Sequence, residues 1–222
     1  MSDTLYLSLW YPNLRLDAMA DKLTAVLSAF AAHGGEKRVY SATVWPVSWN
    51  ESPVFEQVYG RRVRAADAGT DENVTFELGV EPRLAVEDAL EQLHEDFAYE
   101  FQIGWNLWEL EEPTPPQEAR WTRQMRLVRV VGYGPLFDEG TYEADGHIRI
   151  DFGPDTPFLE EDLELDSVAA RHVEENVRQL VELTAAIEKA SGATARILWS
   201  ELGESLAERL AARLSKRAGG AN

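Results

Sequence analysis

The sequence predicts an α+β protein, with a mainly antiparallel sheet of about eight strands and helices packed on one face. Three observations predict this class. Segments with alternating apolar residues outnumber segments with a helical apolar stripe, short turn sequences join most of them, and no run of alternating strand and helix units appears. The order of elements also fits two similar halves that meet near residues 97–120, although no residue-level repeat supports a duplication.

The chain is predicted to begin with a strand followed by a helix. Leu5, Leu7 and Leu9 alternate with less apolar residues, which is the period of a strand with one buried face. From residue 16 the apolar positions recur at helical spacing, and the glycine pair at 34–35 ends this helix.

The next part of the chain is predicted to contain three strands and a helix. Residues 39–47, 54–59 and 74–78 each alternate with period two, and a short turn joins the first two segments. Pro82 suits the first position of a helix, because the N–H group that proline lacks has no helical partner there. The apolar stripe of this helix extends to Phe97.

A second group of strands flanks a proline-rich segment. Residues 97–107 and 121–131 alternate, whereas the prolines within residues 111–118 exclude that segment from the interior of a sheet. An Asp-Gly dipeptide lies near the middle of residues 141–152, with apolar residues on both sides. Because Asp-Gly favours tight turns between strands, we expect a hairpin over these residues.

The C-terminal part of the chain is predicted to be helical. Apolar residues recur at helical spacing over residues 167–191, and leucines recur every four residues over 200–216. We therefore expect one α+β domain over residues 1–199, followed by a C-terminal helix and a disordered tail over residues 200–222.

The composition excludes several classes of protein. The 222 residues include no cysteine, which excludes disulfides, thiolate metal sites and cysteine nucleophiles. The net charge of −18 opposes binding to nucleic acid, because the phosphate backbone is bound through Lys and Arg. No apolar stretch reaches the roughly 20 residues of a membrane span, and the first residues do not resemble an export signal. We expect a cytoplasmic protein that binds neither membranes nor nucleic acid.

The negative charge is concentrated in two parts of the chain. Residues 61–110 contain twelve acidic and four basic residues, and residues 137–166 contain eleven acidic residues and one arginine. Such runs most often form only a solvated surface, and the alternative interpretation is a docking surface for a basic protein.

No motif for catalysis, a cofactor or a metal is found. Phosphate-binding glycine loops and serine-nucleophile signatures are absent. Glu91 and His94 have the spacing of two ligands on one helix face, but carboxylate metal sites need a second such pair. His147 lies between Asp145 and Asp151 without a calcium-loop pattern. We assign no catalytic residue, cofactor or metal, and the sequence leans against an enzyme.

Tryptophan and tyrosine are the more informative residues. Trp45 and Trp105 share strand faces with aliphatic residues and are predicted to lie in the core. Other aromatic residues lie at turns or on more polar strand faces, and together with the second acidic segment they form the predicted binding residues. These residues are Trp10, Tyr11, Trp49, Trp108, Glu143, Asp145, Asp151, Glu160, Glu161 and Asp162.

These features favour a non-enzymatic acidic protein that binds a basic protein partner, as an inhibitor of the immunity or antitoxin type would. An alternative is an enzyme or binding protein for small molecules or carbohydrates that uses carboxylates and tryptophan. A third hypothesis is an assembly subunit whose C-terminal helix docks on another copy. The sequence leaves the oligomeric state open.

Overall fold

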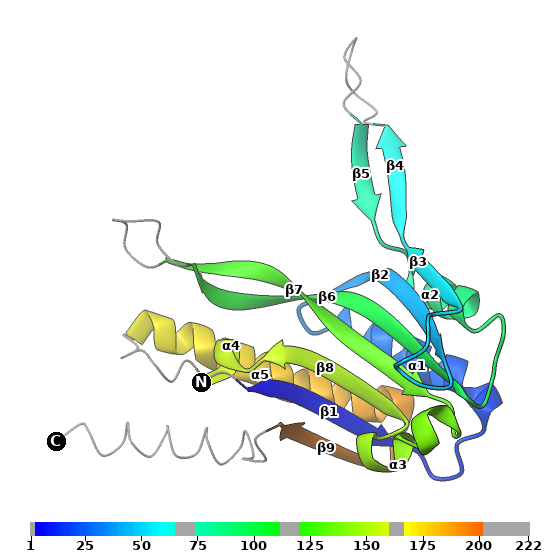
Figure 1. The fold of residues 1–222 in the computed structure, drawn as a ribbon. Helices are drawn as coiled ribbons and strands as arrows, with labels where there is room; N and C mark the ends of the chain where they lie inside the picture. The colour runs from blue at the N-terminus through cyan, green and yellow to red at the C-terminus, as the bar shows by residue number, and fades with distance from the viewer. Residues whose placement is uncertain (1–2, 65–73, 112–119, 160–166, 202–222) are drawn as a thin grey trace.

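Seven strands form one antiparallel sheet in the computed structural model, which describes residues 3–64, 74–111, 120–159 and 167–201 (Figure 1). The strands are β1 (Thr4–Trp10), β2 (Gly35–Pro46), β3 (Phe55–Val58), β6 (Phe97–Glu111), β7 (Arg120–Tyr133), β8 (Ile148–Pro154) and β9 (Ala195–Ser200). Their spatial order is β3-β2-β6-β7-β8-β1-β9. This architecture confirms the predicted α+β class, with seven strands in the sheet rather than eight.

Two further strands form a separate ribbon. β4 (Gly60–Arg64) pairs with β5 (Val74–Leu78) in antiparallel register, and the ribbon projects away from the main sheet (Figure 1). Residues 65–73, between the two strands, lie outside the described residues.

The three longer helices lie on one face of the sheet. α1 (Met19–Phe30), α2 (Pro82–Ala89) and α5 (Ser167–Ser191) are behind the sheet in Figure 1. The shorter helices are η1 (Leu16–Ala18), η2 (Phe137–Glu139), α3 (Tyr142–Asp145) and α4 (Thr156–Leu159). Among the described residues, no helix combines the length and the hydrophobicity that crossing a membrane requires.

The main core lies between the sheet and these helices. Leu5, Leu7 and Leu9 are fully buried on one face of β1, as the alternation predicts. Trp105 is also fully buried, and its ring contacts Phe30 at 6.3 Å between centroids. Burial of each large apolar side chain in this core contributes about 1.5–3 kcal/mol.

A second, smaller cluster lies on the face of the sheet that the helices leave uncovered. Val131, Tyr133 and Phe137 are buried there, and Trp45 and Trp49 pack against them. Trp45 is therefore half-buried in this cluster, whereas the sequence placed it in the main core. The cause is an irregular register between β2 and β6, which interrupts the alternation before Trp45.

Asn176 anchors helix α5 to strand β6. Its side chain is fully buried, accepts a hydrogen bond from the N–H of Trp108 at 2.9 Å and donates one to the carbonyl of Trp108 at 2.8 Å. The same amide donates to the carbonyl of Pro157 at 2.9 Å. Trp108 is paired with Arg123 of β7 on one side, and the Asn176 side chain takes the place of a strand on the other side, where the pairing with β2 ends at Trp105.

Two predicted elements are wrong. The hairpin expected over residues 141–152 is a helix followed by a strand, because Gly146 adopts φ 86° and ends α3 instead of forming a turn between strands. The helix expected to continue to Phe97 ends at Ala89, and the residues after it bond to other loops.

Strand β9, over residues 195–200, was not predicted, and it pairs with β1 at the edge of the sheet. The predicted helix over residues 200–216 and the tail that follows it fall almost wholly outside the described residues, which end at Glu201.

Replacing Asn176 with leucine should lower the free energy of unfolding by about 2–4 kcal/mol, because the N–H and carbonyl of Trp108 and the carbonyl of Pro157 lose their partner. Urea denaturation measures this change. Glu174→Ala, at an exposed position of the same helix, should change the value by less than about 0.5 kcal/mol. Equal effects of the two variants would contradict the anchoring role.

Candidate functional site

Three loops meet at one end of the sheet and form what we call the three-loop surface. They are residues 47–54 between β2 and β3, residues 90–96 between α2 and β6, and residues 134–147 between β7 and β8. They come together because antiparallel neighbours place the end of one strand beside the start of the next.

Backbone hydrogen bonds join the three loops directly. The N–H of Val47 donates to the carbonyl of Asp96 at 2.7 Å, and the N–H of Asp138 donates to the carbonyl of Val47 at 2.7 Å. The N–H of Leu136 donates to the carbonyl of Glu95 at 2.8 Å. Each loop is therefore bonded to at least one other, and the surface forms one connected unit.

The same loops contain strained backbone. Val47, Asp138 and Glu139 have φ of 60°, 45° and 59°, a region that residues other than glycine rarely adopt and that is least suited to a β-branched side chain. Gly134 is required by close approach, because a Cβ atom there would lie 2.4 Å from the carbonyl oxygen of Glu95. Strained conformations persist where the surroundings over-determine them, which is common at functional sites.

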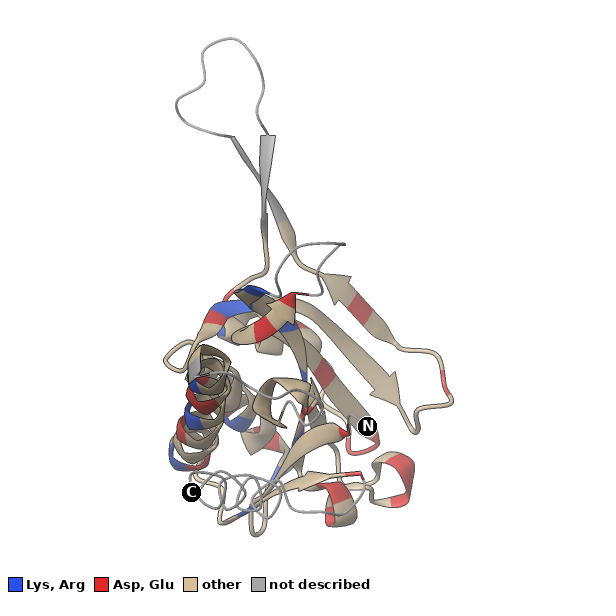
Figure 2. Ribbon diagram, turned by 90° about the vertical axis from the view of Figure 1, so that its left-hand side faces the viewer, with Lys and Arg blue, Asp and Glu red and all other residues tan. Residues whose placement is uncertain are grey.

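The charge of this surface is of one sign. The loops contain eight acidic residues and no lysine or arginine. Asp145 pairs with Arg149, and Asp96 pairs with His94. The other six acids are exposed and form no ion pair with a described residue: Glu51, Glu91, Glu95, Asp138, Glu139 and Glu143. In Figure 2, the side of the molecule farthest from α5 shows acidic segments and no basic ones.

Apolar side chains lie among these acids. Val47 is 53% exposed and Leu136 is 61% exposed. Beneath them Trp49 packs against Phe137, with 5.1 Å between ring centroids. The surface therefore has exposed apolar residues, an aromatic support and acidic surroundings.

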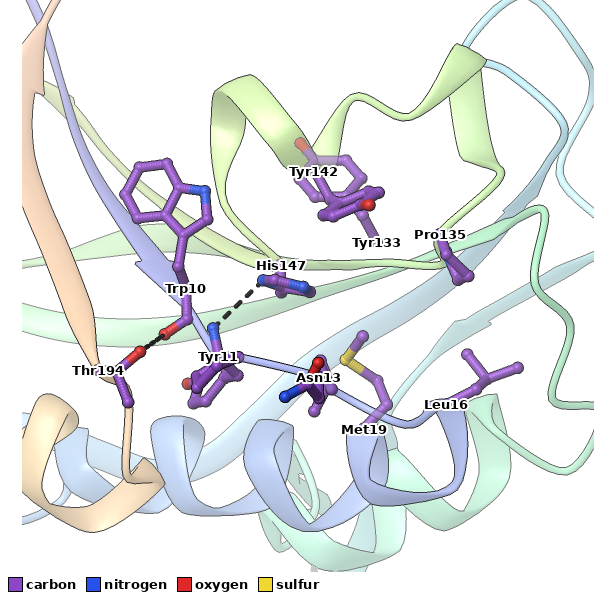
Figure 3. Close-up of a pocket in the computed structure, with 12 residues that line it drawn as sticks. Trp10, Tyr11, Asn13, Leu16, Met19, Tyr133, Pro135, Tyr142, His147 and Thr194 are labelled. Carbon is purple, nitrogen blue, oxygen red and sulfur yellow. Dashed lines mark hydrogen bonds between the residues drawn. The ribbon is translucent and has the colours of Figure 1, made fainter.

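A cavity of about 480 Å³ lies beside the three-loop surface and shares the segment 134–147 with it (Figure 3). Most of its lining side chains are aromatic or aliphatic, and in Figure 3 Tyr133 and Tyr142 lie on one side of His147, with Asn13 and Met19 on the other. Its volume falls in the usual range for small-molecule sites, about 300–1,000 Å³. None of the described residues that line it is acidic, and none is Lys or Arg.

His147 is held in one orientation at the centre of this cavity. Its Nδ1 accepts a hydrogen bond from the N–H of Tyr11 at 3.3 Å, and its ring lies 4.8 Å from that of Tyr142. Burial lowers the pKa of His147 below its usual value of 6.5, so the ring is neutral at pH 7. With Nδ1 acting as acceptor, the neutral ring carries its proton on Nε2.

Tyr133 borders the same cavity, but its hydroxyl is enclosed by protein atoms and does not face it. The residue is 1% exposed, and its hydroxyl has no hydrogen-bond partner among the described residues. Burial raises the pKa of Tyr133 well above 10, so the group remains a neutral hydroxyl. Arg149 lies over the ring of Tyr133 at 5.7 Å from its centroid, on the uncovered face of the sheet.

The structure brings some of the predicted binding residues together. Trp10 and Tyr11 both line the cavity, and the indole N–H of Trp10 donates to the carbonyl of Glu143 at 3.3 Å. Trp49 lies in the aromatic cluster under the three-loop surface. Asp145 belongs to that surface, but Arg149 neutralises it.

Other predicted binding residues lie elsewhere. Trp108 contacts His172 of α5, with 4.0 Å between ring centroids, and its indole N–H donates to Glu175 at 3.0 Å. Asp151 lies on β8, opposite Arg129 of β7. Glu160, Glu161 and Asp162 lie outside the described residues.

The sequence did not single out several residues of the site. Tyr133 and Tyr142 line the cavity, and Glu95 and Asp96 belong to the three-loop surface. Their only signal was position near the ends of predicted segments, which identifies neighbours only when the strand order is known.

The metal-like spacings do not lead to a metal centre in the structure. Glu91 and His94 do not share a helix face, because α2 ends at Ala89. His147 faces Tyr11 and Tyr142 rather than Asp145 or Asp151. Within residues 3–64, 74–111, 120–159 and 167–201, no group of three or more potential ligands (His, Asp or Glu) is placed to hold a metal ion.

Replacing Val47 with glycine should raise the free energy of unfolding by about 1 kcal/mol, because glycine adopts a positive φ without steric cost. Thermal or urea denaturation would show the change. Val54→Gly is the matched control, since Val54 is similarly exposed at 58% and has an ordinary φ, and it should lower the value by about 0.5–1 kcal/mol. A loss of stability in both variants would show that Val47 is not strained.

His147 should make the protein less stable as the pH falls below about 6.5. Its folded-state pKa is lowered, so the unfolded chain binds the proton more readily and protonation favours unfolding. His147→Asn keeps an acceptor for the N–H of Tyr11 and does not titrate. Urea denaturation from pH 7 to pH 5 should therefore show a larger loss for the wild type than for the variant, and parallel losses would refute this assignment.

Comparison with known proteins assigns no function to the chain, so a function can be inferred only from the geometry of the site. No protein-family model, no curated protein and no solved structure matches the chain.

Proposed function

We propose that this is a non-enzymatic acidic binding protein that docks a basic protein partner on its three-loop surface, as an inhibitor of the immunity or antitoxin type would. The observation that carries the proposal is the charge of that surface, with eight acidic residues and no Lys or Arg in three loops that are bonded to one another. Six of these acids have no intramolecular ion pair among the described residues and are available to a partner.

The rigidity of the surface supports the proposal. Binding by a mobile loop costs free energy for ordering it, and a surface fixed in advance avoids that cost. The two hydrogen bonds of Val47 and the positive φ of Asp138 and Glu139 fix where these acids point. The strain in this backbone is explained if the orientation of the acids matters for docking.

The apolar residues within the surface support it as well. Charged residues alone steer an encounter and provide little affinity, whereas interfaces have an apolar centre and a polar rim. Val47 and Leu136 provide exposed apolar area, and the acids provide the rim. The net charge of −18 extends the attraction for a basic protein over a longer distance at low salt.

The alternative, a carboxylate-based enzyme for small molecules or carbohydrates, has one observation in its favour, which is the cavity beside Trp10 and His147. That mechanism requires two carboxyl groups about 5–9 Å apart at the substrate. The described lining of the cavity has none. We therefore favour the protein-binding function.

A pull-down from lysate of the source cells, at about 50 mM and about 500 mM salt, tests the proposal. The test variant, Glu95→Gln/Glu139→Gln/Glu143→Gln, removes three surface charges with little change of shape. The control variant, Glu111→Gln/Glu174→Gln/Glu182→Gln, removes three exposed charges elsewhere. Wild type and control should retain a basic protein at low salt and release it at high salt.

The test variant should bind the same protein about tenfold more weakly than the control variant, since each exposed pair contributes up to about 1 kcal/mol. Titration calorimetry with the purified partner measures the difference. Retention of no basic protein at low salt, or equal affinity of the two variants, would reject the proposed function.

A further inference from the structure

The cavity beside His147 has the features of a ligand site that is separate from the docking surface. It has a volume of about 480 Å³, and Trp10, Tyr11 and Tyr142 provide aromatic walls (Figure 3). The indole N–H of Trp10 is bonded to the carbonyl of Glu143, so this wall is fixed before any ligand enters. Aromatic walls favour a ligand with a flat ring, because ring faces pack well against one another.

One polar group of the cavity is left for a ligand. The Nε2–H of His147 donates to no described residue, because the one hydrogen bond of the ring uses Nδ1. The hydroxyl of Tyr133 also has no partner in the described part of the chain, but it is enclosed by protein atoms and does not face the cavity, so it offers no hydrogen bond to a ligand.

The charges around the cavity select a neutral ligand. An anion would face the exposed acids Glu139 and Glu143 at the nearby loop, and no Lys or Arg lines the cavity to balance it. Lys22 lies 5.3 Å from the ring centroid of Tyr11, but its ammonium group donates to the carbonyl of Ser191. A cation would find no lining carboxylate, and ammonium or guanidinium groups offer no acceptor to the Nε2–H of His147. An uncharged ligand with a carbonyl oxygen avoids both charge problems and accepts the hydrogen bond from His147.

We propose that this cavity binds a neutral, planar aromatic molecule that carries a carbonyl or an equivalent hydrogen-bond acceptor. The aromatic ring of the ligand packs against Trp10 and Tyr142. Its acceptor takes the hydrogen bond from Nε2 of His147. This site does not depend on the protein-binding function of the three-loop surface.

Three probes of matched shape test the proposal: benzamide, which is neutral, benzoate, which is an anion, and benzamidine, which is a cation at pH 7. Each is titrated to about 10 mM, the range in which a fragment of this size binds. Two-dimensional NMR of the full-length protein follows the backbone signals of Tyr11, Tyr142 and His147. Benzamide should shift these signals, and the two charged probes should bind at least about tenfold more weakly.

One variant tests the polar group. His147→Asn keeps an acceptor for the N–H of Tyr11 and removes the Nε2–H donor. It should weaken binding of benzamide about three- to tenfold. Two control variants should leave binding unchanged: in Tyr133→Phe the lost hydroxyl is not accessible from the cavity, and in Tyr59→Phe the lost hydroxyl bonds to Asp88 of α2 outside the cavity.

Urea denaturation at pH 7 checks that His147→Asn is folded, since the asparagine keeps an acceptor for the N–H of Tyr11. The proposal is overturned if benzamide leaves the cavity signals unchanged, if the charged probes bind as well as benzamide, or if His147→Asn binds benzamide like the two controls.

Discussion

Helices cover only one face of the seven-stranded sheet, and this constraint determines how the loops pack on the other face. The uncovered face still has to bury large aromatic residues of β2 and β7. It does so with the loops at the end of the sheet, which fold back so that Trp49 and Phe137 pack on Tyr133. Arg129 and Arg149 lie over the exposed sides of these rings. The loops are therefore part of a packed unit.

This packing gives the segment 134–147 two roles. One side of it contributes acids to the three-loop surface, and the other contributes Tyr142 and His147 to the cavity. The two regions differ in chemistry, since the first is charged and exposed and the second is mostly apolar with the Nε2–H of His147 as an available donor. Hydrogen bonds from Val47 to its neighbours hold the first, and the bond from Tyr11 to His147 holds the second.

Part of this arrangement could be predicted from the sequence. The alternation of Leu5, Leu7 and Leu9 predicted a strand with one buried face, and periodicity located all three long helices, though not the end of α2. Trp10 and Glu143 were both predicted as binding residues, and their contact through the indole N–H was not foreseen. The Asp-Gly dipeptide at Asp145 led to the wrong prediction of a hairpin, because glycine with positive φ ends helices as readily as it forms hairpin turns.

The sequence by itself determined the fold class, the burial of the leucines of β1 and the excess of acid, because these depend on local period and composition. Only the tertiary structure decided which acids become neighbours. Glu95 and Glu139 are far apart in the chain, and the order of strands brings their loops together at one end of the sheet, where Leu136 bonds to the carbonyl of Glu95. The tertiary structure also places Trp108 and Trp10 in different regions. Trp108 packs against His172 of α5 and Trp10 lines the cavity, because an aromatic residue on a strand packs against the element that covers it.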